Sequence, residues 1–533
     1  MTLKLSGLKN HNLRAGWFFL AGLAVVVAVG LLQTAPGYMD ADYYYSGGIQ
    51  LADGKGFTQP FLWNYLDDPL GLPAPANTFW MPLVSILSAA GYTLFHTFTG
   101  GRIFLWLLAA IIPALTYWIG MRQHGDIKLA ALGGIFSIFS GYYLVYMPTT
   151  DSFGMTMLLG SLFLLLGSRI SRGSDMAPLW LGGTVGLLHM TRADGILWLA
   201  GGLLWILWVW VRSGSPRERR WAWLLAAWGL CLAGYLVVAS PWYVRNWLEF
   251  GSLFPPGGSK TLWLTQYEDL FLFPSSQLTF TRWLEMGWTQ ILSGWGRALW
   301  SNLQTAVAGQ GSIILGPFIV VGLYKIRKQA EVVLGASMWL LTLAVFSLVF
   351  PYQGVNGSFF HSGAAFQPLF WAAAPVGIAQ TVQYVAGLRK WQRGTQVQRF
   401  LSILLVVVCL LLSLGLAGRK LMGIAGSPAW NAGAAPYARV DQALVDLGAT
   451  PCELVMVNNP PGYYLASGRS AVGIPYGDET TLRSVAEKYA VRFLVIDQNN
   501  AGYLSRLFLE PASYPGFRFL IQQGDFRIYE FER

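Results

Sequence analysis

The chain has 533 residues, of which 54% are hydrophobic and only 12% are charged, and its mean hydropathy is +0.45. This composition excludes a soluble enzyme of this size and indicates a polytopic α-helical membrane protein. The net charge of +10 would suit a nucleic-acid-binding protein, but basic residues of membrane proteins collect on the cytoplasmic side, so we expect no nucleic-acid partner.

Apolar runs close to the length that crosses a membrane recur along the chain. They lie at roughly 16–34, 80–97, 102–120, 129–147, 153–170, 178–190, 195–212, 222–240, 306–324, 332–350, 366–388 and 399–417. The first run follows Lys4, Lys9 and Arg14 and lacks a convincing signal-cleavage site. We therefore predict a retained first helix with its N-terminus in the cytoplasm.

The distribution of basic residues decides whether the run at 80–97 crosses the membrane. If it does not cross, the later basic clusters fall on the cytoplasmic side together with the N-terminus; these clusters lie at 121–128, 169–177, 212–221, 325–331 and 389–399. If it does cross, all of them lie outside, against the positive-inside rule. We predict about eleven transmembrane helices, in-plane outer helices that include residues 80–98, and an extracytoplasmic C-terminus.

The first outer loop, residues 35–101, begins with a segment rich in acidic and aromatic residues. Residues 38–45 contain two aspartates and four tyrosines where the first helix emerges into water. An acidic, aromatic pocket at a membrane surface suits a lipid-linked polar substrate. The alternative is a hydrated loop whose aspartates cap short helices.

The segment 178–212 has the pattern of a helical hairpin broken at Thr191-Arg192-Ala193-Asp194-Gly195. Arg192 and Asp194 would lie at or just below the outer interface, where charged side chains usually face a cavity or a partner. A plain turn whose charges reach back to water is the alternative.

Two later outer segments are candidates for lids or for plain connections. The segment 240–305 begins with Pro241-Trp242-Tyr243-Val244-Arg245-Asn246 and is rich in aromatic residues that suit a membrane interface. The segment 351–361 is polar, contains no Lys or Arg, and ends at His361.

From residue 425 the composition changes to that of a small soluble α/β domain. Strands are predicted at 454–458, 471–475 and 492–497, a helix at 479–489, and a hairpin at 517–522 and 526–531. We place a transmembrane domain at 1–424 and an extracytoplasmic α/β domain at 425–533. Some polar and aromatic side chains at the strand ends could form a binding edge, although ordinary solvation is the preferred interpretation; they are Asn458, Tyr463, Tyr464, Arg469 and Asp497.

Phosphate-binding motifs of nucleotide enzymes are not found in the sequence. There is no P-loop, and Asp53-Gly54-Lys55-Gly56-Phe57 lacks the spacing of a dinucleotide fingerprint. A cytoplasmic nucleotide-sugar donor is therefore not expected.

Over residues 16–420 the chain resembles the GT-C superfamily of membrane glycosyltransferases, specifically the branch of protein O-mannosyltransferases and aminoarabinose transferases. Four motifs in order carry the resemblance: Asp40-Ala41-Asp42-Tyr43-Tyr44 with Leu51 to Phe57, Trp80-Met81-Pro82-Leu83, Thr191 to Gly195, and Pro241 to Asn246. The resemblance implies an inverting transferase in the cell envelope. It would move a hexosyl or pentosyl group from a polyprenyl-phosphate donor to a protein, lipid or glycan acceptor on the outer face.

The resemblance and the chemistry of inverting transfer assign roles to several residues. A carboxylate must take the acceptor's proton, and Asp40 is the first candidate with Asp42 the second. Many relatives have adjacent acids where Ala41 separates these two, so the choice stays open. The leaving phosphate needs positive charge or hydrogen-bond donors, for which Arg192, Arg245 and Asn246 are the candidates.

The same resemblance implies a second acidic position in the next outer loop, where Asp151 stands. A divalent cation such as Mg²⁺ or Mn²⁺ would take oxygen ligands from Asp40, Asp42 and Asp151, although parts of the family work without metal. The candidate substrate-binding residues are Tyr43, Tyr44, Asp67, Asp68 and His361. Asp68-Pro69 could equally begin a turn.

A transporter or flippase of lipid-linked saccharides is the main rival to the enzyme. A transporter usually places ionisable residues near the membrane midplane and has repeated halves. Here the charges gather at the outer interface and no repeat is recognisable, which favours the transferase. A receptor or assembly protein is a third reading, and it predicts that function survives the loss of Asp40 and Asp42.

Overall fold

The structure is a computed structural model that describes residues 5–212, 217–391, 394–424 and 429–532. Lys4 and the predicted domain boundary at 425 lie outside the described residues. The chain divides into two compact, discontinuous units. The bundle unit comprises residues 1–32, 102–243 and 294–420, and the sheet unit comprises residues 33–101, 244–293 and 421–533. The predicted division into 1–424 and 425–533 stays a prediction.

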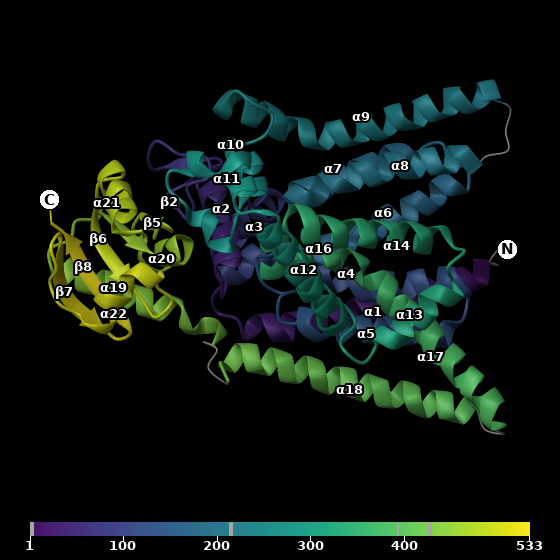
Figure 1. Cartoon of the computed structure of the whole chain (residues 1–533). Coiled ribbons are helices and arrows are strands. Elements are labelled where there is room, and N and C mark those ends of the chain that lie inside the picture. Colours follow the sequence, from purple (N-terminus) through teal and green to yellow (C-terminus); the bar gives the residue numbers. More distant parts are fainter. Residues whose placement is uncertain (1–4, 213–216, 392–393, 425–428, 533) are drawn as a thin grey trace. The chain divides into compact units, whose positions relative to one another are not determined.

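Among the described residues, seven helices are long and apolar enough to cross a membrane (Figure 1). Five of these spans lie in α1 (Leu5–Leu31), α4 (Phe98–His124), α6 (Phe153–Ser171), α9 (Arg217–Phe250) and α18 (Gly394–Met422). The other two are Ala193–Arg212, which includes α8 (Ile196–Arg212), and Ala330–Val349, which continues α14 (Ala330–Ala344) by one further turn. This confirms the predicted class, a multi-pass helical membrane protein.

Four further helices coincide with the remaining predicted crossings. They are α5 (Ile127–Ile138), α7 (Ala177–Thr191), α13 (Gly316–Lys325) and α17 (Gln367–Arg389). The first three have 12, 15 and 10 residues, so they extend only about 15–23 Å, less than the roughly 30 Å of a bilayer core. The count of about eleven crossings therefore stays a prediction.

Close helix packing inside the bundle unit depends on small residues. A Cβ atom added at Gly322 of α13 would clash with the carbonyl oxygen of Ala373 in α17, and one at Gly377 would clash with that of Phe318. Small residues let membrane helices approach closely, since lipid provides no hydrophobic force between them. In α17, Trp371 is fully buried by this packing.

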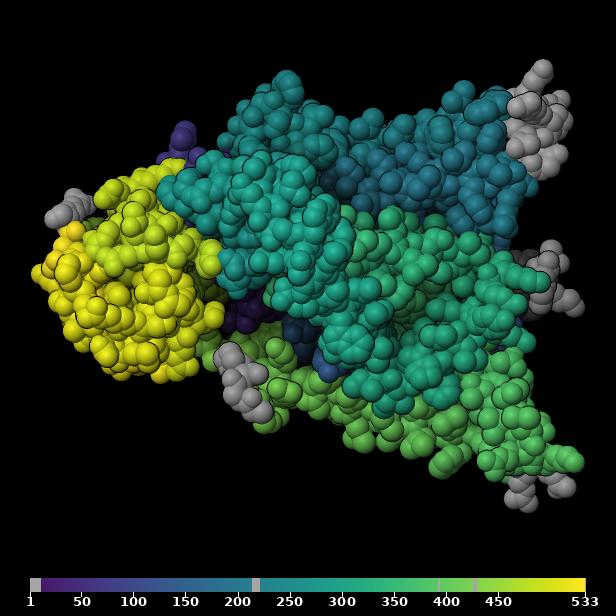
Figure 2. All heavy atoms as spheres, in the orientation of Figure 1, coloured from purple at the N-terminus to yellow at the C-terminus, as the bar shows by residue number. Residues whose placement is uncertain are grey.

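Helix α18 has one apolar exposed face and one buried face. Phe400, Leu411 and Leu414 are among its exposed apolar side chains, whereas Cys409 and Ser413 are buried. The exposed surface of this helix is part of the green region in Figure 2. Such an apolar face in contact with water would be costly, so it is suited to lipid.

The apolar run at 80–97 forms α3 (Leu83–Phe95), which belongs to the sheet unit. Its 13 residues extend about 20 Å, too short to cross a bilayer. Its neighbour is α2 (Met39–Ala52), where Gly47 and Gly48 lie against Ser85 and Ser88. The length agrees with a helix that does not cross, and its in-plane orientation stays a prediction.

The sheet unit contains a six-stranded sheet in the order β2-β5-β4-β6-β8-β7. The strands are β2 (Phe61–Leu62), β5 (Ala471–Gly473), β4 (Leu454–Val457), β6 (Val491–Ile496), β8 (Phe526–Phe531) and β7 (Phe517–Gln523). The first four are parallel to one another, β8 is antiparallel to β6, and β8 and β7 form an antiparallel hairpin. The predicted small α/β fold is confirmed.

Both faces of this sheet are covered, because successive residues of a strand point to opposite sides. In β4, Met456 lies in a core with Leu482 and Val485 of α21 (Glu479–Lys488). Val455 lies in a separate core with Val440 of α19 (Ala434–Asp446). The helix α22 (Ser505–Leu509) contributes to the first core through its buried apolar residue.

The elements of the sheet unit that were not predicted include β2 and α20. Strand β2 comes from the first outer loop and pairs with β5, although more than 400 residues lie between them in sequence. Helix α20 (Pro460–Ser467) follows the predicted strand at 454–458. The side chain of Asn459 accepts a hydrogen bond from Gly462 N at 3.1 Å, and prolines occupy the first helical positions, so the same residues that punctuate a turn also start a helix.

Ordinary solvation, the preferred reading of Tyr463 and Arg469, is wrong because both side chains are buried. Arg469 Nε donates to Asp441 Oδ1 at 2.6 Å, and the Tyr463 hydroxyl donates to the same oxygen at 2.9 Å. Asp441, whose side chain is 17% exposed, is thus the centre of a largely buried polar cluster. In the same domain, Asn458 donates to Asp497.

We expect Arg469→Met to lower the free energy of unfolding by about 3 kcal/mol, because it leaves Asp441 without its charged partner. Thermal unfolding of the purified protein measures this change. The matched variant Arg518→Met also removes a salt bridge, to Glu530, but the Arg518 side chain is 58% exposed. Its loss should cost no more than about 1 kcal/mol; equal effects of the two variants would contradict the argument.

Candidate active site

The acidic segment of the first outer loop is helical rather than a loop. Helix α2 begins at Met39 and places Asp40 and Asp42 in its first turn, where the helix dipole favours negative charge. Its N-cap residue is Tyr38, so neither aspartate is the cap residue and the capping interpretation is wrong. The sequence of this segment suggested a loop because its glycines and polar residues interrupt the apolar repeat that is typical of a helix.

Asp42 is a buried carboxyl group, with only 8% of its surface exposed. Asn459 Nδ2 donates to Asp42 Oδ2 at 2.9 Å. Burial raises the pKa of Asp42 to about 7; the hydrogen bond from Asn459 lowers it in part, and the negative charge of Asp40 raises it further. A carboxyl group with a pKa near neutrality is suited to general base catalysis.

Tyr43 and Tyr44, predicted to bind substrate, are each only 2% exposed. The Tyr43 hydroxyl accepts a hydrogen bond from Asn77 N at 2.6 Å, and its ring centroid lies 4.8 Å from that of Trp80. Both tyrosines therefore pack the interior of the sheet unit. Their assignment to substrate binding stays a prediction.

Arg245 and Asn246 are engaged within the sheet unit. The Arg245 guanidinium donates to the carbonyl oxygens of Phe57 and Ala76 at 3.2 and 3.0 Å, and to Asn246 Oδ1 at 3.0 Å. Asn246 is 1% exposed and donates to Leu253 O at 3.1 Å. These contacts hold the end of α9 against the first outer segment, and the phosphate contact of both residues stays a prediction. The predicted loop also begins later, because α9 extends to Phe250.

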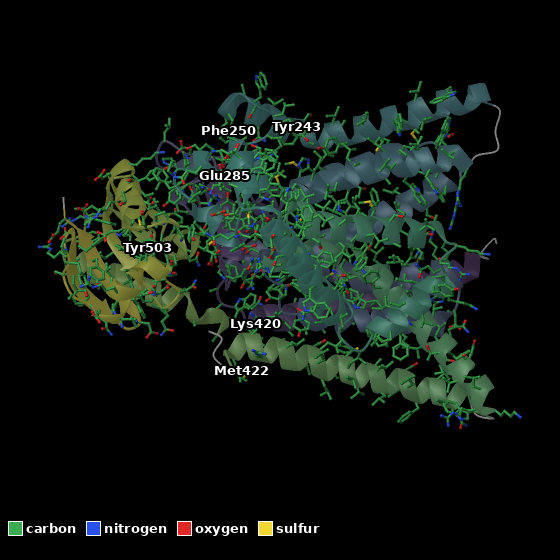
Figure 3. All side chains as sticks on the ribbon, in the orientation of Figure 1. Tyr243, Phe250, Glu285, Lys420, Met422 and Tyr503 are labelled. Carbon is green, nitrogen blue, oxygen red and sulfur yellow. The ribbon has the colours of Figure 1, made fainter. Side chains whose placement is uncertain are left out.

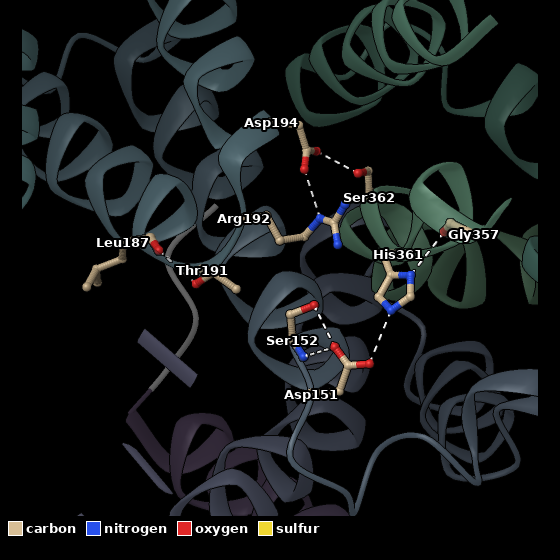
Figure 4. Close-up of polar contacts among 9 residues, drawn as sticks. All are labelled: Asp151, Ser152, Leu187, Thr191, Arg192, Asp194, Gly357, His361 and Ser362. Carbon is tan, nitrogen blue, oxygen red and sulfur yellow. Dashed lines mark hydrogen bonds and ion pairs between the residues drawn. The ribbon is translucent and has the colours of Figure 1, made fainter. Parts of the chain in front are cut away.

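In the bundle unit, the break between α7 and α8 positions a buried ion pair (Figure 4). Arg192 has an extended backbone, with φ −150° and ψ 140°. Its Nε donates to Asp194 Oδ1 at 2.9 Å, and Asp194 Oδ2 accepts from Ser362 Oγ at 2.5 Å. The two charged side chains are only 16% and 14% exposed. The interpretation that they extend into water is therefore wrong.

The turn itself requires glycine at one position. A Cβ atom at Gly195 would clash with the backbone of His189. The close approach brings α8 back along α7, where Gly202 lies against Leu181. Thr191 closes α7 by donating its hydroxyl proton to Leu187 O at 2.7 Å. The predicted helical hairpin is thus present.

A second polar pair in the bundle unit joins Asp151 to His361 (Figure 4). His361 Nε2 lies 3.1 Å from Asp151 Oδ2, and the ring of His361 stacks on Phe153 with centroids 4.1 Å apart. The other carboxylate oxygen, Asp151 Oδ1, accepts from the backbone nitrogen and the hydroxyl of Ser152. The Asp151 side chain is 1% exposed and that of His361 is 15% exposed.

A second hydrogen bond orients the ring of His361. His361 Nδ1 lies 3.0 Å from Gly357 O, a group that can only accept, so Nδ1 is the donor of this bond. The other ring nitrogen, Nε2, is the one that faces Asp151.

His361 was assigned to substrate binding in the segment 351–361, and the structure makes this segment two short helices. They are α15 (Pro351–Gln353) and α16 (Phe359–Gly363), and the chain between them is kinked where Asn356 and Gly357 have non-helical backbone angles. Sequence reasoning did not pair His361 with Asp151, or Ser362 with Asp194, because 210 and 168 residues separate them. No local signal in the sequence could have found either contact.

Asp151 and His361 could contribute an oxygen and a nitrogen ligand to a divalent cation. The Nδ1 contact to Gly357 O is the type of outer hydrogen bond that orients metal-binding histidines. A cation requires more ligands than these two. His361 was absent from the predicted metal set, whereas Asp151 was part of it.

Asp67 and Asp68 lie at the edge of a pocket in the sheet unit. Asp67 Oδ1 accepts from Gly257 N at 2.7 Å, and Asp68 Oδ1 lies 2.7 Å from Lys488 Nζ. Asp68 has a positive φ of 49°, in agreement with the turn proposed for Asp68-Pro69. Asp68 therefore both forms the predicted turn and lines the pocket.

The bundle of apolar helices and the mixed α/β sheet define a multi-pass helical membrane protein with a small α/β domain. The chain is similar to ArnT from Cupriavidus metallidurans, solved bound to undecaprenyl phosphate, with a TM-score of 0.52 and 14% identity. The apo structure of ArnT gives a TM-score of 0.50, and both comparisons cover 97% of this chain and 98% of the other. No family model and no curated protein matches the sequence. The comparisons confirm the fold predicted from the GT-C resemblance.

Proposed function

We propose that the protein is an inverting glycosyltransferase that moves a sugar from a polyprenyl-phosphate donor to an acceptor on the outer face of the membrane. The observation that carries this proposal is the fold shared with ArnT over 97% of the chain, together with the undecaprenyl phosphate bound in one ArnT structure. In the proposed orientation the N-terminus is cytoplasmic, and α2 and the sheet unit are extracytoplasmic.

In the proposed reaction, a carboxylate of α2 removes the proton of an acceptor hydroxyl. The hydroxyl oxygen attacks the anomeric carbon, and the bond from that carbon to the phosphate oxygen breaks. The products are the glycosylated acceptor and polyprenyl phosphate. Asp40 and Asp42 are the candidates for the base, and the raised pKa of Asp42 supports that residue.

The leaving phosphate gains negative charge as its bond to the sugar breaks, so it needs donors that are already oriented. We assign this role to Arg192, because its Nε bond to Asp194 fixes the plane of the guanidinium. Ser362 in turn fixes Asp194. Asp151 and His361 would balance charge during transfer or hold a cation such as Mg²⁺ or Mn²⁺.

The test is transfer by the purified full-length protein in lipid nanodiscs. Synthetic polyprenyl-phosphate hexose and pentose donors carry a radiolabel in the sugar, and the extracted lipids, proteins and glycans of the cell envelope serve as acceptors. We expect release of polyprenyl phosphate that depends on acceptor, and a product of inverted anomeric configuration. Movement of intact lipid-linked sugar across liposomes without any transfer would instead establish the flippase.

A further inference from the structure

A pocket of about 510 Å³ lies within the sheet unit, between the segment Asn64–Thr78 and the end of α9. Its volume falls in the range of small-molecule sites, roughly 300–1,000 Å³. One wall is the proline-rich turn from Asp67 to Pro75, and the opposite side includes Glu249 and Phe250. Phe250 is labelled in Figure 3.

Gln59 provides a polar group that points to a ligand. It belongs to the short strand β1 (Thr58–Gln59), whose backbone pairs with β3 (Ala74–Pro75). Its side chain lines the pocket and is 8% exposed. The amide has both a donor and an acceptor group, so it suits a bound polar ligand.

Asn64 adds a second buried amide to the lining. It is 8% exposed, and its side-chain oxygen accepts from Leu66 N at 3.0 Å. That bond fixes the orientation of the amide, so the side chain offers its NH₂ group as a hydrogen-bond donor to a ligand. Gln59 and Asn64 together therefore offer both donors and acceptors from rigid positions.

Carboxylates supply the remaining polar lining. Asp67, Asp68 and Glu249 line the pocket, and none of the described lining residues is Lys or Arg. Asp67 is held by its bond to Gly257 N, and Asp68 by its ion pair with Lys488. Carboxylates only accept hydrogen bonds, so they select a ligand rich in donors and repel an anion.

We propose that this pocket binds a neutral or amine-bearing saccharide. Hydroxyl groups both donate and accept, so a polyhydroxylated ligand satisfies the carboxylates and the two amides at once. A phosphate or carboxylate ligand would meet like charge, and a simple ammonium would leave the amide donors of Asn64 without an acceptor.

The pocket lies close to α2, so we assign it a role in acceptor binding. This assignment rests on the proposed function. Thr78 lines the pocket and directly follows Asn77, whose backbone nitrogen donates to Tyr43. Tyr43 is adjacent in sequence to Asp42. The pocket thus holds the saccharide portion of the acceptor beside the helix that carries the proposed base.

The test measures sugar binding to the full-length protein in nanodiscs without donor, by saturation-transfer difference NMR. Methyl glucoside, glucosamine and glucuronate are the neutral, cationic and anionic probes. We expect the first two to bind, and glucuronate to bind at least about tenfold more weakly, as repulsion by nearby carboxylates predicts. Gln59→Met should lower the affinity for methyl glucoside about three- to tenfold, because one hydrogen bond is lost.

A second variant keeps the proposal testable if Gln59→Met folds poorly. Glu249 is exposed and lines the pocket. Glu249→Gln should raise the affinity for glucuronate and change the affinity for methyl glucoside less than about twofold. Glu285→Gln, labelled in Figure 3 and outside the pocket, is the matched control and should change neither. Equal binding of the three sugars, or no binding of any, would overturn the proposal.

Acceptor-dependent release of polyprenyl phosphate separates this inference from the proposed function. Sugar binding that depends on Gln59, with no release from any donor, would leave the pocket in place and contradict the transferase. If polyprenyl phosphate is released and Gln59→Met leaves the KM for acceptor unchanged, the result would contradict acceptor binding in the pocket and support the transferase.

Discussion

Replacing Asp42 by asparagine is expected to abolish sugar transfer and, at pH 8, to make the protein more stable. A general base contributes about 10²–10⁴ in rate, so kcat/KM should fall by that factor. The side-chain oxygen of asparagine can still accept the hydrogen bond of Asn459. The fold around position 42 should therefore persist while the base is lost.

The gain in stability follows from the raised pKa of Asp42. Because its pKa in the folded state is about 7 and its ordinary value is 3.8, the folded protein binds this proton more tightly than the unfolded chain. Stability therefore falls as the pH rises from about 4 to about 7. At pH 8, Asp42→Asn should recover about 2–4 kcal/mol, and at pH 4 the two proteins should unfold alike.

Thermal unfolding at the two pH values and the pH profile of transfer measure both effects. A base is active only when deprotonated, so kcat/KM of the wild type should rise with pH and level off above about 7. Asp53→Asn is the matched control, because Asp53 ends the same helix and is 41% exposed. Transfer that survives in Asp42→Asn and disappears in Asp40→Asn would make Asp40 the base.

The general architecture could be predicted because hydrophobic periodicity and basic clusters are local properties of the sequence. The non-crossing run at 80–97 is an example: the positive-inside rule excluded a crossing, and the structure gives a helix of 13 residues. The strands after residue 454 were likewise visible as short apolar runs between turn residues. Residue types could also identify Asp42 and Arg192 as candidates, whereas Asp151 was found through the resemblance.

What could not be predicted depends on contacts between distant segments. Strand β2 adds only two residues to the sheet, too few for any period to show. Tyr43 and Tyr44 have the composition of a binding surface, but packing against Trp80 places them in the core. Aromatic residues serve both purposes, and only the fold decides between them.

The roles of charged residues are equally hard to predict from sequence. Arg192 and Arg245 both follow an apolar run and both suit a phosphate. The structure separates them, since Arg245 donates to backbone carbonyls whereas Arg192 is oriented by a carboxylate. An arginine held by carbonyl oxygens stabilises a loop, and one held through Nε by a carboxylate presents an oriented guanidinium plane.

Arg192→Lys is expected to lower kcat/KM for donor by about 10²–10³, the usual cost of removing an oriented donor from a developing oxyanion. Lysine keeps the positive charge but loses the planar fork that matches phosphate oxygens. Steady-state kinetics with a polyprenyl-phosphate sugar, together with binding of polyprenyl phosphate itself, separate the effects on transfer and on affinity. Asp194→Asn should have a smaller effect in the same direction, since the bond that orients Arg192 weakens without the charge being lost.

A purely structural role for Arg192 would give a different result. Removing a buried cation leaves Asp194 without its partner, so Arg192→Ala should also lower stability by about 3 kcal/mol. Arg282→Ala is the matched control, because Arg282 makes a comparable pair with the buried Asp269 in the sheet unit. If both alanine variants lose stability but bind polyprenyl phosphate as the wild type does, the phosphate role is excluded. If only Arg192→Ala loses that affinity, the guanidinium contacts the phosphate, and the α7–α8 break is part of the donor site.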